Sequence, residues 1–172
     1  VLDFGGSLGT TYWQHRGALG RLAELRWDVV EQPHFVEAGR RHLQDETLRF
    51  FTTIEEAESQ GAHDVLLVSG VIHCLPDPHG WLDRWARTGP PVLLLHNLPL
   101  HDREPDHVRI QHVPPVIYPA TYPVWFFNRP GFLAHFAGRY DVVRSYPSTA
   151  VWSMGWRDYP STGLMLRRRP AS

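Results

Sequence analysis

The first nine residues, Val1-Leu2-Asp3-Phe4-Gly5-Gly6-Ser7-Leu8-Gly9, constrain the fold more than any other segment of the chain. An apolar start carries one acidic residue and leads directly into a glycine-rich turn, which predicts a strand followed by a helix. Glycine adopts positive φ without steric cost and lets the backbone approach a ligand closely. The helix that follows directs its N-terminal amides toward the turn. The segment therefore predicts a ligand-binding strand–turn–helix unit, and a tight connection without a ligand is the alternative.

The rest of the chain alternates strand and helix patterns, which favours a mostly parallel sheet covered on both faces. The continuous apolar run over residues 65–68 is typical of a central strand. A hairpin over residues 140–146 and 163–168, joined by a long loop, is expected to close the sheet in antiparallel fashion. Further strands are predicted over residues 1–4, 27–31, 48–52, 64–69 and 91–96, and helices over 10–25, 33–42, 128–136 and after Thr53 and Asp77.

Composition limits the classes of protein to which the chain can belong. Its 172 residues fit one domain, residues 1–172, and a net charge of −1 encodes no general attraction to nucleic acid or anionic lipid. One cysteine, Cys74, is compatible with a reducing compartment, and we expect a cytoplasmic protein. We expect no membrane span, and a homo-oligomer is possible. Because Val1 already belongs to a predicted core strand, we expect a segment upstream of it.

A dinucleotide site is the first alternative for the opening turn. Its fingerprint, Gly-x-Gly-x-x-Gly, would require glycine where the chain has Ser7 and Thr10 when it is started at Gly5. Starting one residue earlier requires glycine at Phe4. Both registers fail, which disfavours a nicotinamide oxidoreductase.

Acidic and small residues also stand at the ends of later strands. Glu31 follows the second predicted strand, where a carboxylate can accept both hydroxyls of a ribose; a solvated strand end is the alternative. The fourth strand runs into Ser69-Gly70-Val71-Ile72-His73-Cys74-Leu75-Pro76-Asp77. Cys74 is interpreted as a small buried hydrophobe.

These strand ends, in this order, resemble the cofactor motifs of class I S-adenosylmethionine-dependent methyltransferases. More narrowly, the opening residues and the segment from Val113 to Phe127 resemble a bacterial methyltransferase family, some of whose members are linked to surface-glycan clusters. The resemblance implies a Rossmann-like α/β fold with seven strands, helices on both faces and an antiparallel last strand. It also implies S-adenosylmethionine as cofactor. The implied cofactor-binding residues are Asp3, Gly5, Gly6, Ser7 and Gly9 for the amino-acid tail, Glu31 and Gln32 for the ribose, Phe51 and Thr52 for the adenine, and Ser69 and Gly70 near the methyl group.

Residues 98–127 are expected to form a proline-dense, substrate-facing loop, because loops this long inside a compact domain are often functional. An ordered surface excursion is the alternative. We expect the acceptor to be a small molecule or a glycan, methylated at oxygen. His101, with Asp102 next to it in sequence, is the favoured general base, with His73 and His96 as alternatives. Expected acceptor-binding residues are His96, Tyr118, Tyr122 and Trp125.

Two further alternatives concern function. The adenine-binding aspartate that many of these methyltransferases carry after the third strand is absent, so a catalytically inactive, methyltransferase-like binding module is the second hypothesis. The histidines lack the spacing of zinc sites, and we expect no metal. A divalent ion held by His96, His101 and Asp102 is the alternative to that expectation.

Overall fold

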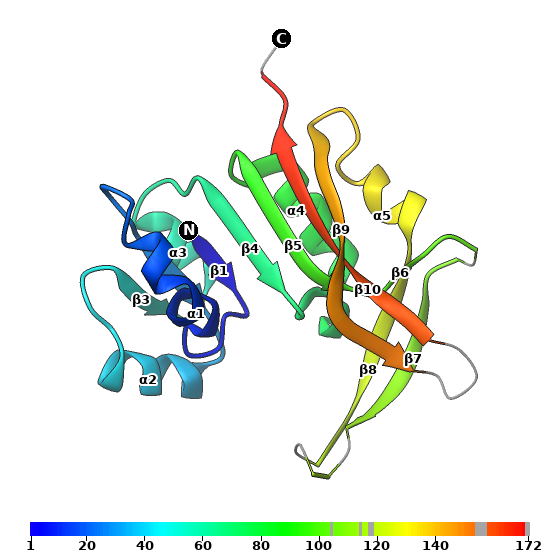
Figure 1. The fold of residues 1–172 in the computed structure, drawn as a ribbon, viewed down its shortest axis with the longest axis horizontal. Helices are drawn as coiled ribbons and strands as arrows, with labels where there is room; N and C mark the ends of the chain where they lie inside the picture. Colours follow the sequence, from blue (N-terminus) through cyan, green and yellow to red (C-terminus); the bar gives the residue numbers. More distant parts are fainter. Residues whose placement is uncertain (104, 114, 117–118, 154–157, 171–172) are drawn as a thin grey trace.

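The computed structural model describes residues 1–103, 105–113, 115–116, 119–153 and 158–170, and a seven-stranded sheet forms its centre (Figure 1). The strand order is β3-β2-β1-β4-β5-β10-β9. The first five strands in that order run parallel, whereas β10 is antiparallel to both β5 and β9. This confirms the predicted fold class. The strands are β1 (Leu2–Phe4), β2 (Trp27–Val30), β3 (Leu48–Phe51), β4 (Val65–Ser69), β5 (Val92–Leu98), β9 (Tyr140–Ser153) and β10 (Asp158–Arg168).

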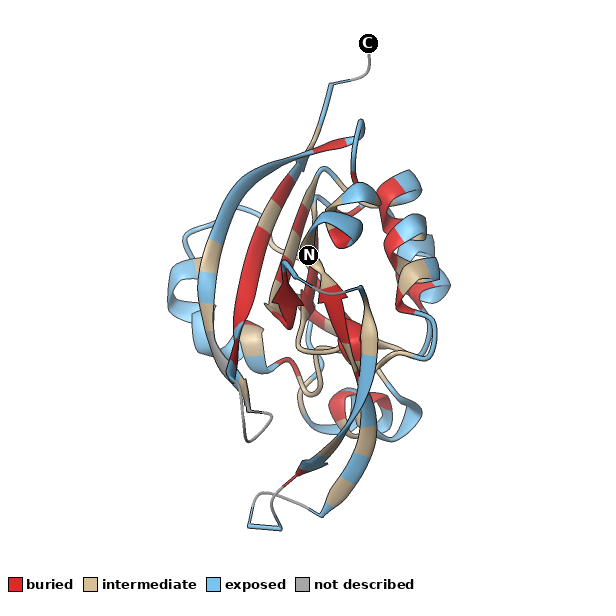
Figure 2. Ribbon diagram, turned by 90° about the vertical axis from the view of Figure 1, so that its right-hand side faces the viewer, coloured by how far each residue is buried: buried red, intermediate tan, exposed pale blue. Residues whose placement is uncertain are grey.

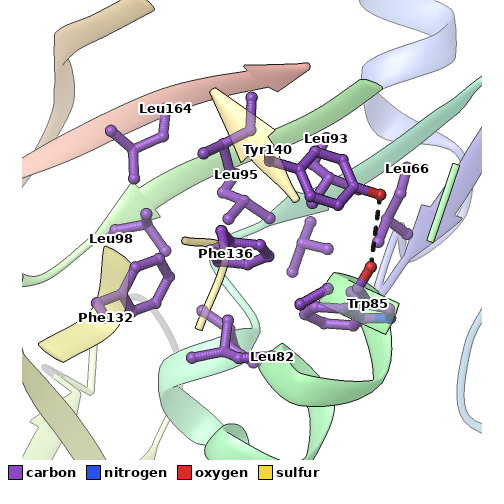
Figure 3. Packing of buried hydrophobic residues seen from close by; sticks show 14 of the residues in the cluster. Leu66, Leu82, Trp85, Leu93, Leu95, Leu98, Phe132, Phe136, Tyr140 and Leu164 are labelled. Atoms are coloured by element: carbon purple, nitrogen blue, oxygen red, sulfur yellow. Dashed lines mark hydrogen bonds between the residues drawn. The ribbon is translucent and has the colours of Figure 1, made fainter. Parts of the chain in front are cut away.

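Helices cover both faces of this sheet. They are α1 (Thr10–Leu19), α2 (Pro33–His42), α3 (Ile54–Ser59), α4 (Pro78–Thr88) and α5 (Arg129–Ala134), with a short 3-10 turn η1 (Ile72–Cys74) before α4. Strand side chains alternate between the faces, so Leu66 and Val68 of β4 belong to one hydrophobic cluster and Leu67 to another. The first cluster packs against α3, α4 and α5 (Figure 3), and the second packs against α1 and α2. Buried residues follow the central strands, while the edge strand β9 is mostly exposed (Figure 2).

Three of the helices begin at side-chain caps. The side chains of Thr53, Asp77 and Asn128 each accept a hydrogen bond from the backbone amide three residues later, as the sequence predicts. Helix α1 is shorter than predicted. It ends at Leu19 with Gly20 as its C-cap, and Leu22, which lies in the predicted helix over residues 10–25, is outside the helix and 55% exposed. Within the described ranges, no helix is long and apolar enough to cross a membrane.

The prediction of a loop over residues 98–127 is wrong. This segment contains β6 (Leu100–His101), β7 (His107–Val113) and β8 (Ala120–Asn128), which form a second sheet in the order β6-β8-β7. Proline suits the first residues of a strand, its edges and the turns between strands. Here Pro105, Pro115 and Pro119 lie between strands. Pro123 of β8 pairs with β7 on one side. On the other side β8 pairs with β6 only at Phe127 and Asn128, so no strand pairs with Pro123 there in the described sheet.

A chain of imidazoles and carboxylates links this small sheet to the helices. His79 of α4 contacts Asp106, which precedes β7, with 3.0 Å between Nε2 and Oδ2. The Nδ1 atom of His79 lies 3.0 Å from Nε2 of His135, and Nδ1 of His135 lies 2.6 Å from Oδ1 of Asp83. The second sheet is therefore attached to both α4 and the end of α5.

The closing hairpin is longer than predicted. Strand β9 continues as far as Ser153, and β10 already begins at Asp158. The sequence predicted a long loop in both places. The extension packs onto the second sheet, since the rings of Phe126 and Tyr159 lie 5.2 Å apart between centroids. Together with Val124 these two rings form a third, smaller hydrophobic cluster. The contact explains the error, because the strand extension depends on a partner sheet that the local pattern does not reveal.

Candidate functional site

The glycine-rich turn after β1 adopts the positive φ angles that its composition predicts. Gly5 and Gly9 have φ values of +74° and +78°, and Ser7 has +52°. The amide of Gly5 donates to the carbonyl of Val30, with 2.9 Å between nitrogen and oxygen. A methyl group added at Gly6 would lie 2.5 Å from Oδ2 of Asp3. The turn therefore folds closely onto the Asp3 carboxylate.

Asp3 is an acidic side chain buried at the end of β1, with 1% of its surface exposed. The indole Nε1 of Trp27 donates to its Oδ2 at 3.0 Å. Burial raises the pKa of Asp3 to about 6, against the lowering effect of that hydrogen bond. Within the described ranges, no arginine or histidine side chain forms an ion pair with it. A buried carboxylate in this state favours a cationic ligand group as its partner.

Asp3 lies in the wall of a cavity of about 590 Å³, here named the Asp3 cavity. The cavity extends between the turn and α1 on one side and residues of β4, β5 and the middle of β9 on the other. Most of the residues that line it have polar side chains; the lining consists of Asp3, Gly5, Gly6, Ser7, Thr10, Thr11, Gln14, His15, Leu67, Ser69, Leu94, His96, Asn97 and Tyr146.

A second cavity, of about 460 Å³ and here named the Glu31 slot, lies at the ends of β1, β2 and β3. Apolar side chains dominate its walls, and the half-buried Glu31 carboxylate is its acidic group nearest β2. That carboxylate accepts a 2.6 Å hydrogen bond from the amide of Gln32. The lining consists of Phe4, Gly5, Val30, Glu31, Gln32, Pro33, Thr52, Thr53, Ile54, Glu55, Val71, Leu75 and Trp81.

Gly5 lines both cavities, so they meet at the turn. One ligand that spans both would place a flat apolar group and a diol in the Glu31 slot. Its cationic group would lie in the Asp3 cavity. This arrangement fits a nucleoside with an amino-acid tail.

The structure brings most of the predicted cofactor residues to these cavities. Gly9 and Gly70 line neither one and instead hold backbone turns at positive φ, +78° and +73°. Phe51 also lines neither cavity: its ring packs against the core and lies 5.3 Å from the Arg49 guanidinium. The Thr52 hydroxyl lines the slot but already donates to the carboxylate of Glu56 at 2.8 Å.

His73 does not line either cavity, which departs from its predicted place below the methyl-transfer site. Its ring is 2% exposed and packs edge-on against Trp152, with 4.7 Å between centroids. Burial lowers the pKa of His73 to about 4, so it is neutral near pH 7. Its neighbour Cys74 packs against the third hydrophobic cluster, and burial raises the pKa of its thiol to about 11. Cys74 is thus half-buried among hydrophobic side chains, where the sequence predicted a buried one.

The buried His73 ring makes a testable contribution to acid lability. Between pH 6.5 and 4 the unfolded chain binds a proton at this residue that the folded chain excludes, so the free energy of unfolding falls as pH falls. The free energy of unfolding of the wild type falls between pH 7 and pH 5, and we expect this fall to be smaller by about 2 kcal/mol in His73→Phe. Urea unfolding at both pH values measures it, with exposed His42→Phe as control. An unchanged acid loss in His73→Phe would contradict the assignment.

No hydrogen bond joins His101 to its sequence neighbour Asp102. Asp102 instead accepts a hydrogen bond from Nε of Arg129 at 3.0 Å. His101 is 7% exposed, and neither ring nitrogen has a hydrogen-bond partner in the described part of the chain. His101 is the last residue of β6, and Asp102 lies in the bend that follows it. His101 lines a separate cavity of about 420 Å³, which adjoins the Asp3 cavity at Tyr146.

Of the predicted acceptor-binding residues, His96 alone among those described lines the Asp3 cavity. Tyr122 packs against the third hydrophobic cluster, and Trp125 packs against the main core and edge-on to His79. Both belong to β8 and are half-buried against these clusters. Tyr118 lies outside the described residues.

The cavity also uses residues that sequence reasoning missed. Asn97 directly follows His96 and has φ of +57°, a conformation that asparagine adopts more readily than most residues. Tyr146 comes from β9 and stacks on His96, with 6.0 Å between ring centroids. Thr10, Thr11, Gln14 and His15 lie on α1, and their polar character in the first turns was the available signal.

Comparison with solved structures shows that this fold is the class I fold of S-adenosylmethionine-dependent methyltransferases. The chain is similar to the N-terminal domain of EvdMO1 with SAH bound, at 14% identity and a TM-score of 0.59, over 98% of this chain and 74% of that one. It is also similar to the mitomycin 7-O-methyltransferase MmcR, at 20% identity and a TM-score of 0.58, and spans 48% of that chain. The chain is also similar to the glycopeptide N-methyltransferase MtfA complexed with S-adenosylmethionine, at 14% identity and a TM-score of 0.61, over 98% of this chain and 86% of that one. No protein-family model and no curated protein matches the sequence.

Proposed function

We propose that the protein is an S-adenosylmethionine-dependent methyltransferase that acts on a small-molecule or glycan-type acceptor at oxygen. The observation that carries this proposal is the meeting of two cavities at Gly5, with Glu31 in one and the buried Asp3 in the other, where Asp3 has no ion-pair partner among the described residues. An apolar slot with the Glu31 carboxylate at the end of β2 suits an adenosine. A polar cavity with a buried carboxylate suits an amino-acid tail, whose ammonium supplies the missing positive charge.

Named residues would hold each part of this cofactor. Asp3 and the amides of the turn would bind the tail, Glu31 the ribose hydroxyls, and the slot between Phe4 and Ile54 the adenine. When bound, S-adenosylmethionine supplies a methyl group on a cationic sulfur, already activated for displacement. The protein chiefly has to orient the acceptor oxygen and remove its proton.

The acceptor side of the proposal is supported by His96 and Tyr146, which line the Asp3 cavity. The stacked pair offers an aromatic face and a base. Among similar structures, MmcR is named as an O-methyltransferase, and EvdMO1 was crystallised with SAH and D-fucose. The resemblance of residues 1–6 and 113–127 to a bacterial methyltransferase family supports the same assignment.

Isothermal titration with S-adenosylhomocysteine, S-adenosylmethionine and NADH tests the proposal directly. We expect both sulfur nucleosides to bind and NADH not to bind. Release of S-adenosylhomocysteine from S-adenosylmethionine in the presence of saccharide acceptors would then separate an enzyme from a cofactor-binding module. Binding of NADH in place of the sulfur nucleosides would overturn the proposal.

Glu31→Gln tests the ribose assignment. The change keeps the shape of the side chain but removes the charge that strengthens hydrogen bonds from hydroxyls, so we expect affinity for 5′-methylthioadenosine to fall about tenfold. Affinity for free adenine, which has no ribose, should not change. Titration calorimetry measures both, with the exposed Glu37→Gln of α2 as control. Equal losses for the two probes would place Glu31 elsewhere than at the ribose.

A further inference from the structure

A hydrogen-bond chain surrounds His96 at the end of β5. The Nδ1 atom of His96 lies 3.2 Å from Oγ of Ser69, and Nε2 lies 2.7 Å from Oγ of Ser148. The Ser148 hydroxyl also donates to Oδ1 of Asn97. Four residues from β4, β5 and β9 are thereby joined, and three of them line the Asp3 cavity.

The number of available protons fixes the donor and the acceptor in each of these hydrogen bonds. The amide oxygen Oδ1 of Asn97 can only accept, so the single hydroxyl hydrogen of Ser148 goes to it. Ser148 must then accept from His96, which places the ring proton on Nε2. In a neutral imidazole the other nitrogen, Nδ1, carries a lone pair, and the hydroxyl of Ser69 donates to it. Burial lowers the pKa of His96, which favours this neutral ring.

Backbone geometry holds the far end of the chain in place. Asn97 has φ of +57°, and the carbonyl of His96 accepts from the amide of Gly70 at 3.0 Å. The backbone of Asn97 is therefore fixed inside β5, at the point where the register between β5 and β10 shifts. Tyr146 stacks on the His96 ring and restricts its rotation.

We propose that Ser148 and Asn97 are positioning residues that hold His96 in the tautomer protonated at Nε2, so that Nδ1 takes the proton of an acceptor hydroxyl, either through Ser69 or in its place. This inference rests on the proposed function. The acceptor oxygen bonds the methyl carbon with its lone pair, the carbon–sulfur electron pair returns to sulfur, and the hydroxyl proton moves to Nδ1. The resulting imidazolium donates from Nε2 to Ser148.

The tautomer can be measured without knowing the acceptor. Long-range ¹H–¹⁵N correlation spectra of the ¹⁵N-labelled protein should show His96 protonated at Nε2 and unprotonated at Nδ1. Ser148→Ala removes the acceptor for Nε2–H, so we expect a mixture of tautomers and a His96 titration midpoint lower by about one pH unit. Ser148→Thr, which keeps a hydroxyl, should restore the wild-type pattern. Ser59→Ala, at the exposed end of α3, is the matched control.

Addition of S-adenosylhomocysteine separates this inference from the proposed function. Saturation of the protein with S-adenosylhomocysteine should move the Nδ1 resonance of His96, because His96 lines the Asp3 cavity in which the ligand's amino-acid tail is proposed to bind. The inference is overturned by Nδ1–H in the wild type, by an unchanged Ser148→Ala spectrum, or by S-adenosylhomocysteine that binds without moving His96. If S-adenosylhomocysteine fails to bind while the Nε2–H tautomer is present, the proposed function is overturned and the tautomer assignment stands.

Discussion

Asp3→Asn is expected to make the ligand-free protein more stable at pH 8 while it removes binding of S-adenosylhomocysteine. Burial raises the pKa of Asp3 to about 6. At pH 8 the carboxyl group is therefore ionised in an environment that favours its neutral form, and this lowers the stability of the folded chain. The folded state binds more protons than the unfolded state between pH 3.8 and 6, and the free energy of unfolding therefore falls as pH rises through that window. Asparagine carries no charge and its oxygen can still accept from Trp27. We expect a gain of about 3 kcal/mol at pH 8.

The same substitution should weaken S-adenosylhomocysteine binding about a hundredfold, since it removes a charged partner for the ligand's ammonium. In the wild type, affinity should also fall as pH drops below 6, because a protonated Asp3 offers no negative charge. Urea unfolding at pH 8 and pH 4 and calorimetry at pH 5 and pH 8 measure these effects. The stability gain should largely vanish at pH 4. The exposed Asp64→Asn serves as control, and a less stable Asp3→Asn protein at pH 8 would refute the assignment.

Gly6→Ala should damage both the fold and the site. The added methyl group would lie 2.5 Å from Cγ and Oδ2 of Asp3 and 2.8 Å from Oδ1. The carboxylate cannot move freely, because Oδ2 is hydrogen-bonded to Trp27. We expect a loss of about 1–3 kcal/mol in the free energy of unfolding, as for other overpacked sites. Affinity for S-adenosylhomocysteine should fall more than tenfold, because the carboxylate leaves its binding position.

Gly17→Ala is the matched control for that experiment. Gly17 lies inside α1, and an added methyl group would meet nothing within 4 Å. Alanine there should raise the free energy of unfolding by about 0.5–1 kcal/mol and leave cofactor affinity unchanged. Thermal and urea unfolding of the two variants measure the contrast. If Gly6→Ala behaves like Gly17→Ala, the close packing of the turn on Asp3 is not what holds the site together.

Several elements could be predicted because local signals and tertiary structure agree. The caps at Thr53, Asp77 and Asn128 bind amides three residues away, so sequence spacing alone reveals them. The apolar run of β4 is buried on both faces, as such a run predicts. The prolines of residues 98–127 misled the prediction, because proline density does not distinguish a loop from turns that join short strands.

The candidate site divides in the same way. Asp3, Gly5 and Gly6 are close in sequence and close in space, and one strand–turn unit contains them. His101 and Asp102 are also adjacent in sequence, yet their side chains contact different partners. Tyr146 and Ser148 reach His96 because β9 lies beyond β10 and curves over the end of β5, a contact that spans some fifty residues.

The sequence by itself determined the alternating strands and helices from β1 to β5, the glycine-rich turn and the carboxylates at the ends of β1 and β2, because each depends on neighbours a few residues away. The tertiary structure alone decided which side chains share a cavity. It buried Asp3 beside Trp27, with no ion-pair partner among the residues that the structure describes, and it brought His96, Ser148 and Asn97 within hydrogen-bond distance of one another. Burial and hydrogen-bond direction are properties of packed surroundings. They arise only when segments distant in the chain come into contact.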